Sequence, residues 1–186
     1  MKIEELILEL SEFPFDHKLN FQAAVEYEKL NQSASAVSFY LRTAEYGPKY
    51  QDPMVYASLI KMAHCFNDQN DREHTVTNCL LQAISYWPER PEAWFFLSQF
   101  YENKENWQET YTYAKVGLSC GEFEPLPVEL GYYGKYCLIF EVAIAAYWIG
   151  RKDESEQLFD YLIARDIHPA YHSAVLENVR RIRASV

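Results

Sequence analysis

The chain has 186 residues, of which 49% are hydrophobic and 24% are charged, so it is long enough for one domain with a substantial core. Acidic residues outnumber basic ones by 27 to 17, and the formal net charge of −10 would repel a phosphate backbone, which argues against a nucleic-acid partner. The six glycines are too few to favour a turn-rich all-β fold.

The first predicted elements are an N-terminal helix within residues 1–15 and a helical hairpin over residues 16–52. Pro14 stops the N-terminal helix, and Asp16 has the side chain expected of an N-cap for the next one. Gly47 and the proline after it end the hairpin in the way that is usual for a helix C-terminus. The chain therefore begins as helix followed by helical hairpin.

Two more hairpins are predicted, over residues 53–90 and 91–120. Pro53 and Pro91 stand where a first-turn proline suits the start of a helix, and Pro88 closes the earlier of the two units. The period of these units is typical of consecutive helical pairs.

The period breaks at residues 121–134, where Pro125, Pro127, Gly131 and Gly134 predict an inserted loop. Two roles for this loop stay open. In one, polar and aromatic residues reach across the mouth of a groove: Glu122, Glu124, Tyr132, Tyr133 and Lys135. In the other, apolar residues fill a gap between the third and fourth hairpins: Phe123 and Leu126.

A fourth hairpin is predicted over residues 135–168, and residues 169–186 are predicted to form a capping helix. The apolar residues of this last helix, Ile182 among them, are expected to pack inward, while Asn178 and Arg181 are expected to turn outward. We treat residues 1–186 as a single domain.

A small residue recurs at the same place in the first helix of each predicted hairpin: Ala24, Ala63, Ser98 and Ala143. Such residues let a second helix approach closely, and bulky neighbours such as Trp94 fill the space between hairpins. One hairpin cannot bury its apolar face alone, whereas a stack can.

This large–x2–large–small–x2–aromatic phrase is clearest at Trp94, Leu97, Ser98 and Tyr101, and it resembles the tetratricopeptide repeat (TPR). The resemblance implies an all-α fold, an α-solenoid of about four TPR-like antiparallel helical hairpins with an N-terminal helix and a C-terminal capping helix.

A narrower resemblance is found in the second half, in the runs Ser85–Trp94, Trp107–Tyr111, Gly131–Tyr136 and Ala145–Gly150. These runs look like the helical repeat module beside glycosyltransferase domains in some bacterial, marine-phage and giant-virus proteins. The chain has no strand-borne Asp-x-Asp and no alternation of strands and helices, so the resemblance implies an accessory or freestanding binding module and no transferase activity.

The TPR resemblance also implies a partner-binding groove on the concave face, aromatic on its floor and mildly acidic at its rim. Extended peptides or amphipathic helices bind surfaces of this kind. The alternative is that the aromatic residues pack against the neighbouring hairpin. The candidate residues are Phe21, Val25, Glu28, His64, Asn67, Phe95, Gln99, Glu102, Phe140 and Tyr147, and the same rule also points to Lys29, Ile60, Asp68, Asn103, Ile144 and Trp148.

Sites of other kinds are not indicated, so no catalytic, cofactor-binding or metal-binding residue is assigned. His168 and His172 are four residues apart, but Pro169 lies between them and no third ligand is near in sequence. His64 and Cys65 are adjacent in a helix and do not face each other, which excludes a Cys–His nucleophilic pair.

The sequence favours a location in the cytoplasm and no membrane partner. Residues 1–10 lack the basic region and cleavage site of a signal peptide, and no apolar run approaches the roughly 20 residues that span a bilayer. Cysteines without Cys-x-x-Cys spacing predict buried, reduced thiols: Cys65, Cys79, Cys120 and Cys137.

We therefore expect a non-catalytic protein-interaction scaffold that binds a peptide or protein, with a glycosyltransferase as one candidate partner. Two alternatives remain. One is an accessory module of a glycosyltransferase system that contacts a glycan or nucleotide-sugar. The other is a homo-oligomer that self-associates through exposed aromatics at Tyr86, Trp87 and Trp107.

Overall fold

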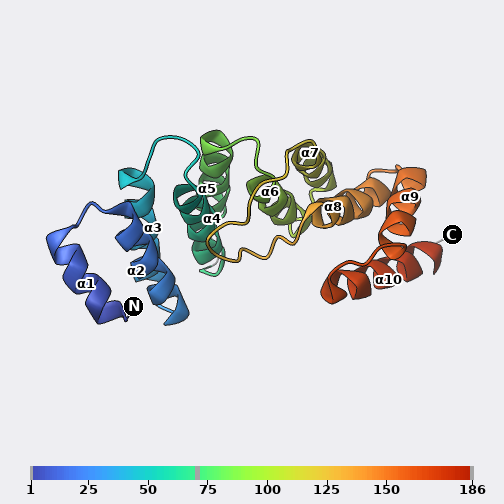
Figure 1. The fold of residues 1–186 in the computed structure, drawn as a ribbon. Coiled ribbons are helices and arrows are strands. Elements are labelled where there is room, and N and C mark those ends of the chain that lie inside the picture. Colours follow the sequence, from blue (N-terminus) through green and yellow to red (C-terminus); the bar gives the residue numbers. More distant parts are fainter. Residues whose placement is uncertain (1, 70–71, 185–186) are drawn as a thin grey trace. The chain divides into compact units, whose positions relative to one another are not determined.

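The computed structural model describes residues 2–69 and 72–184, and within these ranges the regular elements are ten α-helices with no strand (Figure 1). Their bounds are α1 Ile3–Glu12, α2 His17–Lys29, α3 Ser33–Tyr46, α4 Pro53–Asn67, α5 Glu73–Tyr86, α6 Glu92–Glu102, α7 Trp107–Leu118, α8 Lys135–Trp148, α9 Lys152–Ile163 and α10 Pro169–Ala184. From α1 to α5 and from α6 to α10, each helix packs against the next one in sequence.

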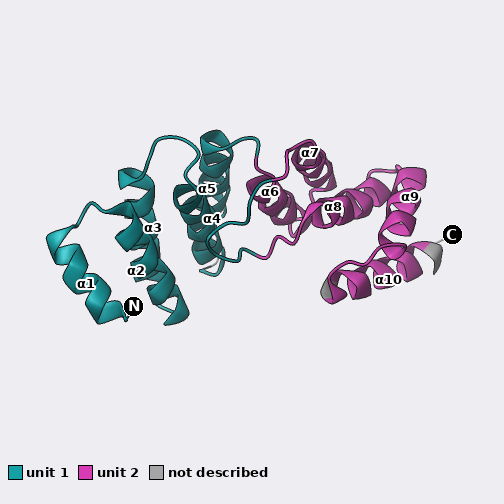
Figure 2. Cartoon of the chain, viewed as in Figure 1, with its two compact units in different colours: residues 1–89, 123–130 teal, residues 90–122, 131–186 magenta. Residues whose placement is uncertain are grey.

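The helices form two compact units (Figure 2). The first contains α1 to α5 together with Phe123–Leu130, and the second contains α6 to α10 with the rest of the insert. The hairpin boundaries and the single-domain organisation given above stay predictions.

Two helix starts follow directly from their capping residues. The Asp16 carboxylate accepts hydrogen bonds from the backbone N–H groups of Lys18 and Leu19 at 2.8 and 3.1 Å, so it caps α2. Asp52 caps α4 in the same way, and Pro53 occupies the first turn, where its missing N–H costs nothing.

The recurring small residues permit close helix packing. Ala24, Ala63, Ser98 and Ala143 are each at most 1% exposed, and each lies on the first helix of a pair. In the α8–α9 pair the Ser155 hydroxyl donates a hydrogen bond to the backbone carbonyl of Ala143 at 2.7 Å, which requires the two helix backbones to be close.

The most buried aromatic residue of α6 is not the one that the repeat pattern suggests. Trp94 is only partly buried and stacks on Tyr113 with ring centroids 6.2 Å apart. Phe95 is 0% exposed, and the Tyr132 ring covers it at 5.2 Å. The insert therefore adds a layer over α6 that the repeat pattern does not contain.

The insert begins and ends in the second unit, but its middle belongs to the first. The Phe123 ring packs edge-on against Trp87 at 5.6 Å, and Pro127 and Val128 line a cavity beside α1 and α2. Further along, Tyr133 stacks on His168 at 4.6 Å. Of the two roles left open for the insert, the one that assigns Phe123 to a gap between the third and fourth hairpins gains no support from this ring contact, because Trp87 lies in the first unit.

Candidate functional site: an aromatic and acidic pocket in the second unit

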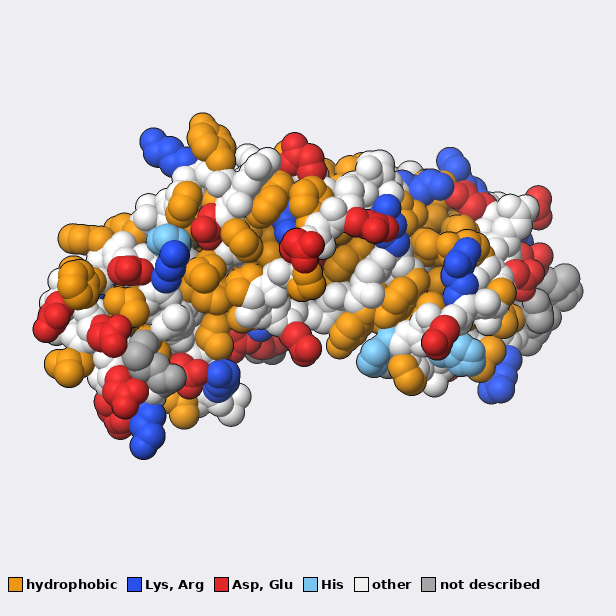
Figure 3. All heavy atoms as spheres, viewed as in Figure 1, with side chains coloured by type: hydrophobic (Ala, Val, Ile, Leu, Met, Phe, Trp, Pro, Cys, Tyr) orange, Lys and Arg blue, Asp and Glu red, His pale blue; other side chains and the backbone are white. Residues whose placement is uncertain are grey.

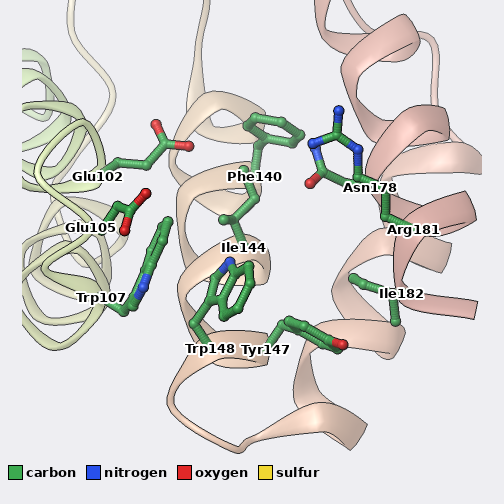
Figure 4. A pocket seen from close by; sticks show the side chains of 10 residues that line it. All are labelled: Glu102, Glu105, Trp107, Phe140, Ile144, Tyr147, Trp148, Asn178, Arg181 and Ile182. Atoms are coloured by element: carbon green, nitrogen blue, oxygen red, sulfur yellow. The ribbon is translucent and has the colours of Figure 1, made fainter. Parts of the chain in front are cut away.

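A pocket of about 540 Å³ opens on the second unit, within the size range of ligand sites in proteins. Its lining comes from α6, the α6–α7 turn, the first residue of α7, α8 and α10 (Figure 4). The lining residues are Glu102, Glu105, Trp107, Phe140, Ile144, Tyr147, Trp148, Asn178, Arg181 and Ile182.

Aromatic rings form one wall of the pocket. Trp107 and Trp148 stack with centroids 5.3 Å apart and an interplanar angle of 16°. Tyr147 meets Trp148 edge-on at 5.5 Å. The Trp148 side chain is 59% exposed although it is large and apolar, so this wall presents a substantial hydrophobic surface to solvent.

The floor beneath this wall is apolar and rigidly packed. Phe140, Ile144 and Ile182 are between 7 and 8% exposed, and Phe140 packs edge-on against Tyr171 at 5.4 Å. Because these side chains are held by the core of the second unit, the floor is formed before any partner arrives.

Charged groups lie on two sides of the pocket. Glu102 and Glu105 project from the α6 side, whereas Asn178 and Arg181 project from α10 (Figure 4). The Arg181 guanidinium is paired with the Glu177 carboxylate on the same helix. The Arg181 charge is therefore balanced on its own helix, while the two carboxylates of the α6 side face the pocket.

Behind Glu102 lies a second, fully buried carboxyl group. Glu141 is 1% exposed, its side chain shares hydrogen bonds with Glu102 and Gln99, and its Oε2 atom has no hydrogen-bond partner among the described residues. Burial, followed by the charge of Glu102, raises the pKa of Glu141 well above its usual range. Burial also raises the pKa of Glu102, so the pair retains a proton to higher pH than exposed carboxyls do.

Three of the ten candidate residues come together here, since Glu102, Phe140 and Tyr147 all line the pocket. Ile144 and Trp148, to which the same rule points, line it as well. Gln99 lies just behind it, hydrogen-bonded to Glu141. Phe95 is fully covered and offers no surface to a partner in this conformation.

The remaining candidates lie in the first unit. Phe21 and Val25 line a cavity of about 450 Å³, whose lining also includes Pro127 and Val128 of the insert. Asn67 is exposed at the end of α4.

Glu28 and His64 have structural surroundings within that unit. The Glu28 carboxylate accepts hydrogen bonds from the Tyr40 hydroxyl at 2.5 Å and the Lys61 ammonium at 2.7 Å. Burial lowers the pKa of His64 to about 4, which keeps its ring neutral at physiological pH. The assignment of the ten residues as a partner-binding set stays a prediction.

The contribution of α10 to the pocket was not predicted from the sequence. Asn178 and Arg181 were expected to turn outward, but both line the pocket together with Ile182. These three residues share one helical face through i, i+3 and i+4 spacing, so the inward position of Ile182 already carried the signal.

The aromatic residues expected to be exposed for self-association are each partly buried with partners inside the chain. The Tyr86 hydroxyl donates a hydrogen bond to the Pro48 carbonyl at 2.7 Å, Trp87 packs on Tyr56 at 6.1 Å, and Trp107 belongs to the pocket wall.

No helix in the described ranges is both long and apolar enough to cross a membrane. Residues 2–69 and 72–184 also contain no cluster of three or more His, Cys, Asp or Glu side chains arranged to hold a metal ion. On the face of the molecule in Figure 3, Lys and Arg side chains are scattered, and hydrophobic side chains are exposed next to acidic ones.

Neither a protein-family model nor a curated protein matches the sequence. Solved structures do match. MamA aligns over 99% of this chain and 90% of its own, with a TM-score of 0.64 and 12% identity. YrrB, described as a TPR protein with an unusual peptide-binding site, aligns over 96% of this chain and 81% of its own, with a TM-score of 0.65 and 11% identity.

PilW, described as a widely conserved type IV pilus biogenesis factor, aligns over 93% of this chain and 73% of its own, with a TM-score of 0.67 and 17% identity. At these identities the likeness shows the fold alone. The fold is the all-helical solenoid of tetratricopeptide-repeat proteins, as the sequence predicts.

Proposed function

We propose that this protein is a non-catalytic interaction scaffold that binds a peptide segment of a protein partner in the second-unit pocket. The observation that carries the proposal is the pocket itself. Inner-facing residues of α8 and α10 build a preformed apolar floor, and one wall leaves Trp148 59% exposed to solvent. A partner that covers this wall gains hydrophobic contact area without reordering the floor.

The fold supports the same proposal, because helical-repeat proteins offer extended surfaces made from successive first helices. YrrB, which shares this fold, is described as having a peptide-binding site. The pocket contains carboxyl groups but no nucleophile activated by an adjacent base among its lining residues, so binding is the role that its chemistry favours.

The partner and the compartment are finer points of the proposal. A glycosyltransferase partner rests on the sequence resemblance alone. A cytoplasmic location is supported by four cysteines that are all buried as free thiols, since a reducing compartment keeps thiols in that state. No contact in the pocket favours a glycan over a peptide, so an accessory glycan-binding role has no separate support.

Selection from a displayed library of random twelve-residue peptides tests the proposal. The full chain is the target, and a Tyr147→Ala/Trp148→Ala variant is the counter-target. We expect enriched sequences whose affinity falls at least about tenfold on the variant, because loss of a buried aromatic contact costs on the order of 2 kcal/mol in interfaces.

Tyr161→Ala is the matched control, since Tyr161 is 42% exposed on α9 and lies outside the pocket. It should leave the affinities unchanged. Failure to enrich any peptide, or enrichment of peptides that bind the double variant as tightly as the wild type, would overturn the proposed function.

A further inference from the structure

We infer that the second-unit pocket selects a cationic side chain, a guanidinium or an ammonium group, as the anchor of the bound segment. The inference rests on the proposed function and names the chemistry of the partner. Its basis is the pair of carboxyl groups and the aromatic wall that line one cavity (Figure 4), together with the buried carboxyl of Glu141, which is hydrogen-bonded to Glu102.

Negative charge predominates around the cavity, which favours the binding of a cation. Glu102 and Glu105 line one side, and Glu141 lies directly behind Glu102. Arg181, the basic residue in the described lining, is already paired with Glu177. A cation placed between the α6 side and the aromatic wall would gain charge-assisted hydrogen bonds to carboxylates in a partly desolvated site.

The buried carboxyl group adds a second observation. Glu141 is 1% exposed and its Oε2 atom has no hydrogen-bond partner among the described residues, although it lies one hydrogen bond away from a residue of the pocket lining. A buried carboxyl is costly in its ionised form unless a positive group approaches, and otherwise it stays protonated. A bound cation would stabilise the ionised form of the Glu102–Glu141 pair.

The aromatic wall is suited to the same type of group. A guanidinium or ammonium group is attracted to the face of Trp more strongly than to that of Tyr or Phe. Within the same wall the Lys152 ammonium already lies 5.6 Å from the centroid of the Tyr147 ring, so one face of these aromatics has a cation in place. The stacked Trp107–Trp148 pair offers a further flat surface, which matches a planar guanidinium best.

The test uses synthetic analogues of a peptide selected against the full chain. One basic residue at a time is replaced by citrulline, which keeps the shape of arginine without its charge, by lysine, or by norleucine. We expect one position at which citrulline and norleucine weaken binding at least about tenfold, the loss typical of a charge-assisted hydrogen bond. Lysine at this position should keep most of the affinity.

A double-mutant cycle assigns this loss to the pocket. On a Glu102→Gln/Glu105→Gln variant the affinities of the arginine and citrulline analogues should agree within about twofold. The positive charge of arginine then has no carboxylate to pair with. Glu156→Gln, an exposed change on α9 outside the pocket, should leave the tenfold difference intact. If the norleucine analogue binds the double variant as tightly as it binds the wild type, the variant is folded.

Selected peptides that bind the pocket without any basic residue, or an arginine-to-citrulline loss that persists on the double variant, would overturn the inference while leaving the proposed function in place. A selection that yields no pocket-dependent peptide would overturn both. The two failures are therefore distinguishable.

Discussion

At the scale of single residues, the spacing of small side chains determines how closely helices pack, and Gly117 on α7 shows this most sharply. A Cβ atom at Gly117 would lie 2.8 Å from Cδ2 of Leu138 and 3.0 Å from Cβ of Trp94, so the Leu138 side chain would have to shift and Trp94 would have to give way slightly. Leu138 is 0% exposed, so it has little room to move.

We therefore expect Gly117→Ala to destabilise the protein by about 1–2 kcal/mol, as overpacking outweighs the roughly 1 kcal/mol that alanine gains over glycine in a helix. Chemical denaturation measures the difference. Thr112→Ala, at an exposed position on the same helix, serves as control and should change the free energy of unfolding by no more than about 0.5 kcal/mol. Equal stability of Gly117→Ala and the wild type would contradict the packing described here.

The buried carboxyl at Glu141 predicts an unusual pH dependence. Its pKa is raised in the folded state, so the folded protein binds more protons than the unfolded chain, and the contribution of this group to stability falls as pH rises above about 4.5. The groups facing it are Glu102 and Gln99 on α6, Cys137 on its own helix and Tyr171 on α10.

Glu141→Gln removes this titration. The free energy of unfolding of the variant relative to the wild type should therefore increase as the pH rises above about 4.5, and denaturant titrations at several pH values measure it. Glu102→Gln alone should show the same trend more weakly, because Glu102 is less buried. A difference that does not change with pH would contradict the burial of an ionisable Glu141.

Single residues also show which burials could be predicted from the sequence and which could not. The repeat pattern correctly placed Ala24, Ala63, Ser98 and Ala143 in buried positions, because their role depends only on the helix next in sequence. It assigned Phe95 to a partner surface, and the structure covers Phe95 with Tyr132. Coverage by a segment outside the repeat cannot be inferred from the repeat itself.

At the scale of elements, the insert links the two units through its own chain. Its residues Phe123–Leu130 belong to the first unit, where exposed and half-buried side chains alternate from Pro125 to Leu130. This alternation is typical of an extended segment that packs one of its two sides against a surface. The tip at Pro127 and Val128 reaches the cavity beside α1 and α2.

Replacement of residues 123–130 by a Gly/Ser linker of equal length should therefore loosen the first unit. We expect faster amide hydrogen exchange in α1 and α2, and at the end of α5 near Trp87, with α8 and α9 protected as in the wild type. Glu129→Ser, an exposed change within the insert, is the control and should leave exchange unaltered. Faster exchange confined to the second unit would contradict this placement of the insert.

The elements were predictable to different degrees. Helix positions followed from capping residues and prolines, as at Asp16 and Pro53, because these signals act locally. The partners of the insert depended on contacts between segments far apart in sequence, and periodicity carries no information about them. On α10 the helical spacing groups Asn178 with Ile182, but it does not show that this face meets pocket residues of α6 and α8.

At the scale of the whole molecule, the net charge of −10 should influence how a partner arrives. If the anchor is cationic, long-range attraction accelerates encounter, and the association rate should fall steeply between low salt and about 1 M salt, where the Debye length shrinks to about 3 Å. Stopped-flow measurements with an arginine-bearing peptide test this. The citrulline analogue is the control and should show a shallower dependence, whereas equal slopes would contradict electrostatic steering of the anchor.

The four tryptophan indole N–H signals in an NMR spectrum of the full chain report directly where a partner binds. Trp107 and Trp148 line the pocket, whereas Trp87 and Trp94 lie outside its lining. Titration with a selected peptide should shift the signals of Trp107 and Trp148 and leave the other two in place. Shifts at Trp87 and Trp94 alone, or no shift at any of the four while the peptide binds, would contradict binding in the second-unit pocket.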